Sequence, residues 1–522
     1  MFEVEEWLHS RIGLNFRSGL GRMQQAVDLL GNPGKSYPII HVTGTNGKGS
    51  TIAFMRELFM GHGKKVATFT SPHIVSINDR ICINGQPIAD ADFIRLANQV
   101  KEMEKTLLQT HDQLSFFELL TLIAFLYFRE QAVDLLGNPE RSYPIIHVTG
   151  TNGKGSTIAF MRELFMGHGK KVATFTSPHI VSINDRICIN GQLIADADFI
   201  RLAEQVKEME KTLLQTHDQL SFFELLTLIA FLYFREQEVD LVLLEVGIGG
   251  LLDTTNVVTG ELAVITSIGL DHQETLGDSI AAIAEQKAGI FKAGKKAVIA
   301  KLPSEARLVC QKKAASLAVD LYQAGQDFSM LNGDFSSSLA NLSQLKIGLE
   351  GAYQQENAAL ALQTFLLFMG ERKEAVDEQV VRQALEKTHW AGRLERIRPQ
   401  IYLDGAHNLP ALTRLVEFVK EKEQEGYRPQ ILFGALKRKD YQGMLAYLTE
   451  NLPPVELKVT GFDYQGSLDE TDVTGYDVIP SYREFISSFE ERADTKDLLF
   501  ITGSLYFISE VRGYLLEREQ IN

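Results

Sequence analysis

One long stretch of this 522-residue chain is written twice in succession. Ala132–Gln237 repeats Ala26–Gln131 at an offset of 106 residues. The copies differ at only four positions, which are Gly34/Glu140, Lys35/Arg141, Pro87/Leu193 and Asn98/Glu204. Solenoid repeats are shorter and occur at least three times. We call Ala26–Gln131 copy one and Ala132–Gln237 copy two. We interpret the repeat as a recent internal duplication of a half-domain, in which one of the two copies is surplus.

Composition narrows the class of protein. Without one copy, roughly 416 residues remain, enough for two or three domains. The net charge of −15 argues against a nucleic-acid binder. The cysteines Cys82, Cys188 and Cys310 form no disulfide framework, which favours a reducing compartment. The first residues carry acids where a signal peptide carries bases, and no apolar run could cross a membrane. We expect a cytoplasmic monomer that binds neither nucleic acid nor membrane.

Strand and helix patterns alternate along the chain. Copy one reads as a strand at Tyr37–Val42, a glycine-rich loop and a helix at Ser50–Gly61, and copy two reads alike. The β-branched runs Val239–Val246 and Ala263–Ile268 follow copy two and resemble strands buried on both faces. This alternation predicts an α/β fold with a mostly parallel sheet. After a break near residues 396–401, further strands predict a second, smaller α/β domain; they are Ile401–Leu403, Ile431–Phe433, Leu457–Val459 and Leu498–Ile501.

The glycine-rich loop between strand and helix predicts a phosphate-binding site. Glycines let backbone N–H groups approach phosphates, the lysine would meet the β- and γ-phosphates, and the serine would bind Mg²⁺. The spacing departs from the common P-loop pattern, and a plain glycine turn is the alternative. The loop occurs in both copies, as Gly44, Thr45, Asn46, Gly47, Lys48, Gly49 and Ser50 and as Gly150, Thr151, Asn152, Gly153, Lys154, Gly155 and Ser156.

Further polar residues follow the later strands. Glu245 ends a central strand, where it would bind Mg²⁺ or cap a helix, and His272 is a second metal-ligand candidate or a loop histidine. Lys287 lies among small and apolar residues, so it needs an anionic partner or a modification unless it is a surface lysine. In the second domain, Asp404 and His407 follow a strand, and Arg393 is available for a phosphate.

Eight motifs occur in a fixed order, namely TGTNGKGS, TSPH, LEVGIGG, LDH, KAGI, GRLE, LDGAHN and ITGSLYF. In this order they resemble the folylpolyglutamate synthases, including the bifunctional dihydrofolate synthases, within the Mur-ligase-like ATP-dependent amide ligases. The resemblance covers the whole chain except the extra copy. It implies a P-loop Mur-ligase-like central domain and a Rossmann-like carboxyl-terminal domain. The implied segments are 1–131 (helix plus surplus copy), 132–396 (ATP binding) and 397–522 (glutamate ligation).

The resemblance also implies roles for individual residues. The P-loop lysine and serine (Lys154 and Ser156, or Lys48 and Ser50), with Glu245 and His272, would bind ATP and Mg²⁺. Lys287 would be carbamylated and help to hold a second Mg²⁺. The ATP and glutamate contacts between the domains would come from Asn357, Arg393, Asp404 and His407. The folate-side loop would be Ser177, Pro178 and His179, or Ser71, Pro72 and His73. The residues expected to act in catalysis are Lys154, Lys48, Lys287 and His272.

The implied reaction is activation of the folate γ-carboxylate by ATP as an acyl phosphate, which the amine of L-glutamate then attacks. Dihydropteroate is an alternative acceptor, giving a dihydrofolate synthase or a bifunctional enzyme. A P-loop kinase or NTPase switch and an inactive, duplicated nucleotide-binding protein are the rivals. Copy two is contiguous with Glu245 and His272, so we expect it to form the working site.

Overall fold

The computed structural model describes the chain except for residues 1, 12–20, 31–39, 43–47, 62–65, 72–75, 109–112, 135–138, 180–181, 214–219, 453–454 and 522. By its internal contacts the chain forms two compact units. Unit 1 comprises Met1–Ser142 and Ala197–Gln237, and unit 2 comprises Tyr143–Asp196 and Glu238–Asn522. This division groups the last helices of copy two with copy one, whereas the sequence places a boundary between the copies.

An eight-stranded sheet in the order β11-β10-β9-β4-β8-β5-β6-β7 organises the first part of unit 2. Copy two supplies β4 (Ile145–Thr149), β5 (Val172–Phe175), β6 (Ile187–Ile189) and β7 (Gln192–Leu193). The following chain supplies β8 (Leu241–Glu245), β9 (Leu262–Ile265), β10 (Lys296–Ile299) and β11 (Asp320–Gln323). All pairs from β11 to β5 are parallel, whereas β6 pairs antiparallel with both neighbours. The predicted mostly parallel α/β sheet is confirmed.

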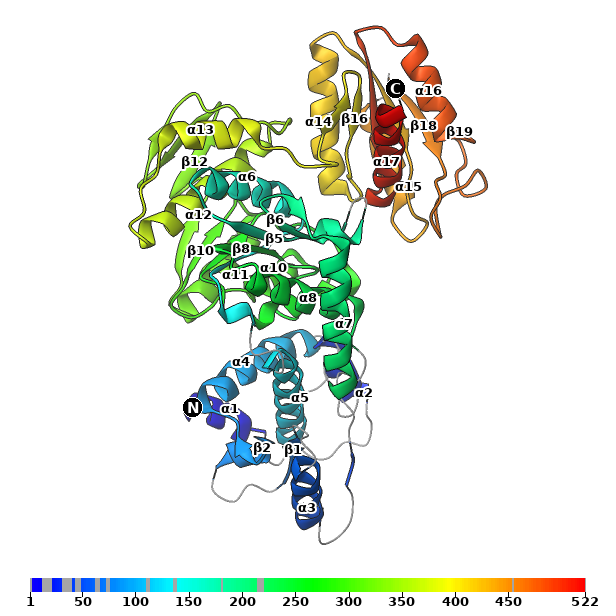
Figure 1. Ribbon diagram of the computed structural model, residues 1–522. Coiled ribbons are helices and arrows are strands. Elements are labelled where there is room, and N and C mark those ends of the chain that lie inside the picture. The colour runs from blue at the N-terminus through cyan, green and yellow to red at the C-terminus, as the bar shows by residue number, and fades with distance from the viewer. Residues whose placement is uncertain are drawn as a thin grey trace. The chain divides into compact units, whose positions relative to one another are not determined.

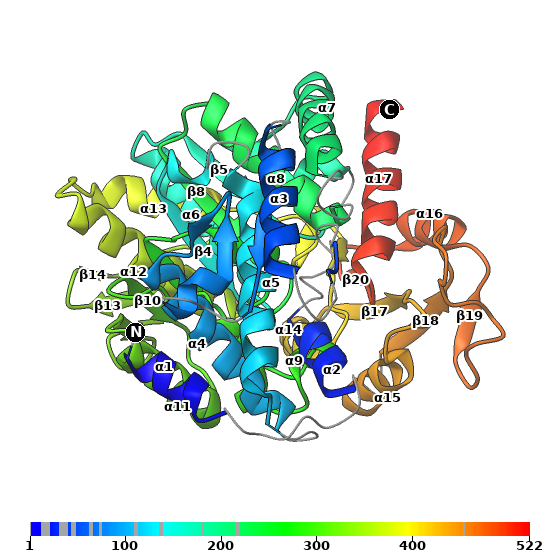
Figure 2. The same ribbon diagram turned by 90° about the horizontal axis from the view of Figure 1, so that it is seen from below.

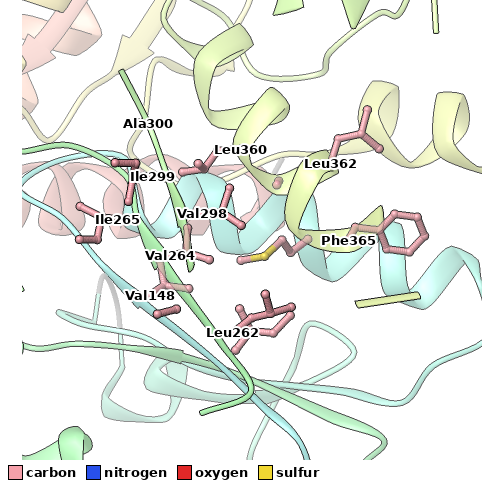
Figure 3. Packing of buried hydrophobic residues seen from close by; sticks show 14 of the residues in the cluster. Val148, Leu262, Val264, Ile265, Val298, Ile299, Ala300, Leu360, Leu362 and Phe365 are labelled. Carbon is pink, nitrogen blue, oxygen red and sulfur yellow. The ribbon is translucent and has the colours of Figure 1, made fainter. Parts of the chain in front are cut away.

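Helices lie on both faces of this sheet, which explains why its central strands are apolar throughout. Figure 1 shows α6 (Lys154–Gly167) and α12 (Gln354–Glu371) above β5 and β8, and α10 (Ile280–Ala288) and α11 (Ser304–Ser316) below them. Side chains of three strands, such as Val148, Val264 and Val298, gather with Leu360 and Phe365 of α12 in one buried cluster (Figure 3). The remaining elements of this part are α9 (Gln273–Leu276), α13 (Glu378–Lys387), β12 (Phe328–Leu331), β13 (Asp334–Ser337) and β14 (Asn341–Leu342).

The carboxyl-terminal part of unit 2 is a six-stranded sheet with helices on both faces. Its order is β15 (Glu395–Arg398), β16 (Ile401–Leu403), β20 (Asp497–Thr502), β17 (Arg428–Phe433), β18 (Glu456–Thr460) and β19 (Asp477–Ile479). One buried cluster contains α14 (Leu409–Gln424) and α15 (Tyr441–Asn451), and another contains α16 (Tyr482–Arg492) and α17 (Leu505–Ile521) (Figure 2). This sheet agrees with the second α/β domain predicted from the sequence. Its first strand begins at Glu395, slightly before the predicted start of that domain at residue 397.

Unit 1 contains copy one and the helices that flank it. The helices are α1 (Phe2–His9), α2 (Gly21–Leu29), α3 (Lys48–Gly61), α4 (Asp90–Leu107), α5 (Phe116–Asp134), α7 (Asp196–Leu213) and α8 (Phe222–Glu236). A small antiparallel sheet is formed by β1 (Ala67–Phe69), β2 (Ile81–Ile83) and β3 (Gln86–Pro87). The buried ion pair between Arg11 and Glu104 connects the amino terminus to α4. No helix in the described ranges is long and apolar enough to cross a membrane.

In copy one, the described part of the predicted P-loop strand forms no strand. The described part of that segment, Ile40–Val42, belongs to no strand, and Ile40 is 59% exposed. The prediction of a strand is therefore wrong for these residues of copy one, although it is confirmed in copy two. The reason is the pairing: β4 is held between β8 and β9, which lie outside the repeat and occur once.

Candidate active site

The P-loop of copy two lies at the carboxyl end of β4, where polar groups after β9 hold it in place. Thr266 Oγ1 and Ser267 Oγ donate hydrogen bonds to the carbonyl oxygen of Asn152 at 2.6 and 2.9 Å. The backbone N–H of Asn152 donates to Ser267 Oγ at 2.8 Å. Thr266 and Ser267 were not picked out from the sequence; both lie inside the predicted strand Ala263–Ile268, whereas the observed β9 ends at Ile265. Their contacts give the loop a defined shape without any ligand.

Two glycines let other groups approach the loop closely. Gly153 has a φ of +86°, and a side chain there would meet Asn357 Oδ1. A side chain at Gly155 would meet the indole of Trp390. Asn357 and Trp390 can therefore pack against the loop, which precedes α6, whose N-terminus adds positive potential. A plain glycine turn would not need these close approaches.

Lys154 and Glu245 meet beside this loop. Lys154 Nζ donates to the carbonyl oxygen of Gly150 at 2.9 Å and lies 3.7 Å from Glu245 Oε1. Glu245 ends β8, is 3% exposed and accepts a hydrogen bond from the backbone N–H of Ser177 at 3.1 Å. Burial raises the pKa of Glu245, while Lys154 and the Ser177 N–H oppose that rise. A carboxylate and a cation thus stand together at the sheet edge.

A buried polar relay connects the P-loop helix to α12. Gln354 Nε2 donates to Ser156 Oγ at 3.4 Å, and Asn357 Nδ2 donates to Gln354 Oε1 at 2.8 Å. Ser156 is 2% exposed. Asn357 was expected near the site from the family resemblance alone, whereas Gln354 was missed. Gln354 belongs to the polar run Gln354–Asn357 at the start of α12, so its residue type does not single it out in the sequence.

Lys287 lies in α10 and is buried, so it is not a surface lysine. Burial is the main cause that lowers its pKa to about 7, and the charge of Lys154 lowers it further. His272 precedes α9 with a φ of 50°, and burial lowers its pKa too, although its side chain is 42% exposed. Its neighbour Asp271 accepts a hydrogen bond from Asn408 Nδ2 at 2.9 Å. These groups line the same edge as Lys154.

The loop after β16 brings the second sheet to this edge. Asp404 accepts backbone hydrogen bonds from Leu394 and Ala406, and burial raises its pKa while Arg393 opposes that rise. His407 is half-buried, and desolvation lowers its pKa to about 4; its Nδ1 lies 2.8 Å from the carbonyl oxygen of Gly405. Asp404 therefore shapes the loop from within.

Asn408 provides the direct connection between the two sheets' loops. Its Oδ1 accepts a hydrogen bond from Asn152 Nδ2 at 3.3 Å, while its Nδ2 donates to Asp271. It also caps α14, because Oδ1 accepts from the backbone N–H of Ala411. Of the motif Asp404–Asn408, the sequence pointed to Asp404 and His407, and the connecting residue was missed.

The loop Ser177, Pro178 and His179 follows β5 on the same side. Its Ser177–Pro178 peptide bond is cis. Arg186 Nε donates to His179 Nδ1 at 3.1 Å, and burial followed by the charge of Arg186 lowers the pKa of His179. His179 also lines a cavity of about 280 Å³ with residues of the carboxyl-terminal part, which are Asp463, Tyr464, Arg483, Tyr506, Ser509 and Glu510.

Copy one offers no comparable arrangement in the described residues. Lys48, Gly49 and Ser50 begin α3, a helix with no buried residue. Ser71 is described and exposed. The remaining residues proposed for this copy, Gly44, Thr45, Asn46, Gly47, Pro72 and His73, lie outside the described residues.

The chemistry of the copy-two residues fits a hard divalent cation bound together with phosphate. Ser156 Oγ and Glu245 supply oxygen, which Mg²⁺ prefers, and His272 adds an imidazole. Within the described ranges no three His, Cys, Asp or Glu side chains form a ready-made metal cage.

Comparison with known proteins places this site in a family. The Mur ligase middle domain model matches residues 148–365, so the match begins in β4 of copy two. The chain is 36% identical to the dihydrofolate synthase/folylpolyglutamate synthase of Bacillus subtilis over 410 residues, which cover 74% of this chain and 94% of the relative. The chain belongs to the folylpolyglutamate synthase and dihydrofolate synthase family. These are ATP-dependent ligases, as the sequence motifs predict.

Other members support the same placement. The folylpolyglutamate synthase of Lacticaseibacillus casei is 35% identical, over 73% of this chain and 92% of its own length. Its apo structure superposes with a TM-score of 0.66 at 32% identity, covering 74% of this chain and 93% of that one. A bifunctional Yersinia pestis enzyme complexed with AMPPNP and Mn ion has a TM-score of 0.66 at 28% identity, with coverages of 74% and 92%. About a quarter of this chain thus has no counterpart in relatives that are matched almost completely.

Proposed function

We propose that this protein is an ATP-dependent ligase that adds L-glutamate to the γ-carboxylate of a reduced folate. The observation that carries the proposal is the copy-two P-loop with Lys154 beside the buried Glu245, in a chain of this family. Related solved structures include a complex with AMPPCP and folate and one with Mn, AMPPNP and L-glutamate. These are the classes of ligand that the reaction requires.

The proposed roles follow from where each group lies. Lys154 and the loop N–H groups would bind the ATP phosphates, with Ser156, Glu245 and His272 as the protein ligands of Mg²⁺. Mg²⁺ would neutralise charge on the phosphates when bound there. Lys287 would be carbamylated and hold a second Mg²⁺. Asn357, Arg393, Asp404 and His407 would contact ATP and glutamate, and Ser177, Pro178 and His179 would face the folate.

The chemistry needs no protein nucleophile. The folate γ-carboxylate attacks the γ-phosphate of ATP, ADP leaves, and the glutamate amine displaces phosphate from the acyl phosphate to form the amide. Three anionic reactants must therefore be brought together. The contribution of Lys154 and Arg393 is to neutralise and orient them, which is the main source of rate in phosphoryl and acyl transfer.

We place the working site in copy two and treat copy one as surplus. The support is that β4 and α6 are buried in the eight-stranded sheet, whereas α3 is exposed. Lys154→Ala is expected to cost more ligase activity than the matched change Lys48→Ala. We also propose that the protein acts in the cytoplasm as a monomer.

A second acceptor, dihydropteroate, is favoured by the printed function of the Bacillus subtilis relative, which covers both activities. The test measures ADP release by the purified protein with tetrahydrofolate or with dihydropteroate, each with and without L-glutamate. A ligase needs acceptor and glutamate together. ADP release without them would indicate an NTPase switch, and ATP binding without release would indicate an inactive protein. Turnover with dihydropteroate decides between the monofunctional and bifunctional alternatives.

A further inference from the structure

The helices α3 and α6 have the same sequence in opposite environments. α3 (Lys48–Gly61) contains no buried residue, whereas α6 (Lys154–Gly167) is buried from Ser156 to Phe165. Phe54 is 73% and Leu58 65% exposed. Their counterparts in α6 are fully buried. An exposed apolar face of this kind usually marks a binding surface.

The surface that fits this face is already visible in the molecule. α6 contacts α12 and α13, and Phe165 makes edge-to-face ring contacts with Phe365 and Phe368 at 5.0 Å between centroids. We call this part of α12 and α13 the α6-binding surface. Because Phe59 occupies the position of Phe165 in an identical helix, α3 is complementary to the same surface.

Equivalent strands of the two copies also differ in their surroundings. β5 pairs with β8 on one side and β6 on the other, while its counterpart β1 pairs with β2 and forms the edge of its small sheet. Strand edges with free hydrogen-bonding groups readily pair with another strand. The strand that matches β1 is β8, which exists once and is used by copy two.

The differences between the copies do not change the side chains that pack in the core of the central sheet. Pro87, Leu193, Asn98 and Glu204 are exposed, and so is Arg141. Glu140 is the one differing position that is buried, and Gly34 and Lys35 lie outside the described residues. The side chains that α6 and β4 insert into the core are therefore the same in both copies.

We propose that the two copies exchange: in a fraction of molecules copy one forms the P-loop strand and helix of the central sheet, and copy two is displaced. The partner of the exposed α3 face is thus the α6-binding surface of the same chain. The alternative arrangement keeps the Arg11–Glu104 ion pair, since Glu104 belongs to copy one and Arg11 lies in the segment that precedes it in the chain.

Chain entropy sets the expected ratio. Ile146 pairs with Leu243 of β8, and Ile40, the counterpart of Ile146, lies about twice as far from Leu243 along the chain. The entropy cost of closing a loop of n residues grows as (3/2) ln n. The arrangement with copy one in the sheet should therefore be about threefold rarer than the arrangement with copy two in the sheet. We expect roughly a quarter of the molecules to use copy one, with slow interconversion because the central sheet must open.

Thiol labelling tests the exchange independently of the proposed function. Thr51 is exposed, whereas its counterpart Thr157 is fully buried with a hydroxyl that makes no hydrogen bond, so cysteine is a mild change at either position. In a chain whose three buried cysteines are replaced by alanine, Thr51→Cys should label in a fast major phase and a slow minor phase. Thr157→Cys should show the inverse, with matching amplitudes.

Controls separate exchange from other sources of two phases. Local opening of α6 would expose Thr157→Cys without protecting any Thr51→Cys, and self-association would make the protected fraction depend on protein concentration. Either result overturns the proposal, as does a single phase for both variants. Deleting Ala26–Gln131 must leave Thr157→Cys with only the slow phase.

If the ligase activity is also established, the lysines give a second measurement. Lys154→Ala should retain roughly a quarter of the activity, supplied by copy one. Adding Lys48→Ala should abolish this remaining activity. Lys154→Ala that is no more active than the double variant would contradict the exchange. An inactive wild-type protein would overturn the proposed function and leave the labelling result decisive for the exchange.

Discussion

Glu245 shows how one buried carboxylate depends on its neighbours. Its two oxygens face Lys154 and the backbone N–H of Ser177, which favour the charged form, whereas burial favours the neutral form. The sequence predicted its position at the strand end, since carboxyl ends of parallel strands meet at the ligand-binding edge. Both partners come from other segments of the chain.

Glu245→Gln is the first prediction at this scale. Glutamine keeps the shape and can still accept the hydrogen bond from Ser177, but it removes the charge that Mg²⁺ and Lys154 require. We expect ligation to fall by about 100-fold or more with little change in thermal unfolding. Rates measured across a Mg²⁺ titration check this. A near-normal rate at low Mg²⁺ would show that Glu245 is structural.

Lys287 gives a second prediction. Its low pKa, caused mainly by burial, keeps a large fraction of the amine neutral near pH 7, and a neutral amine is what carbon dioxide modifies. Activity should rise with bicarbonate in protein prepared without it. Lys287→Ala should be nearly inactive and partly rescued by short carboxylates such as acetate. A fully active Lys287→Ala would refute the carbamate.

His147 gives a prediction about pH. It is buried in β4 beside Thr255, and burial lowers its pKa to about 3, so the folded protein holds it neutral. The unfolded chain binds a proton below about pH 6.5. Its contribution to stability is therefore complete above pH 6.5 and is lost as the pH falls towards 3, by about 1.4 kcal/mol per pH unit.

Thermal unfolding of His147→Asn tests whether this histidine lowers stability as the pH falls. Between pH 7 and 5 the midpoint of the variant should fall less than that of the wild type. His41→Asn is the matched control, because the same residue of copy one is exposed. Equal pH dependence in all three proteins would contradict the account.

At the scale of elements, the repeat shows that helix propensity and packing are separate effects. α3 and α6 are both helices, because they share one sequence and therefore one helix propensity. Only α6 is packed, because α12 and α13 hold one helix at a time. The described residues Ile40–Val42 of copy one form no strand for the same reason, since a strand needs a partner and the neighbours of β4 occur once.

Phe54→Gln and Phe160→Gln form a matched pair that tests this. Phe54 is exposed, so its change should leave the thermal midpoint within about a degree and improve solubility by breaking an apolar patch. Phe160 is fully buried, so a polar group there should destabilise the sheet strongly in the chain that lacks Ala26–Gln131, where copy one cannot take the place of copy two. An unchanged midpoint for Phe160→Gln in that shortened chain would mean that α6 is not the packed helix in solution.

At the scale of the whole molecule, we propose that the extra copy is a liability. It exposes Ile40, Phe54 and Leu58 and leaves β1 at a sheet edge, which are features that favour aggregation. The relatives are matched over more than nine-tenths of their length by about three-quarters of this chain. A chain with one copy is thus sufficient for the family fold.

Deleting Ala26–Gln131, which joins Gln25 to Ala132, is the prediction at this scale. The shortened chain should be more soluble and equally or more active per mole, since it keeps β4 to β11 and the carboxyl-terminal sheet. Ultracentrifugation and the glutamate-dependent ADP assay check both points. Loss of activity or a changed oligomeric state would show that the duplication has acquired a role.

The sequence alone determined the family, the parallel α/β sheets and the residues at their carboxyl edges, because motif order and strand periodicity are local properties. It could not reveal Gln354, Asn408 or Thr266, whose roles arise from contacts with the P-loop across the chain. It favoured copy two for the working site from chain order, but it assigned the same strand and helix to both copies. Tertiary structure decided that, because β8, β9 and the α6-binding surface are single and complete only one copy at a time.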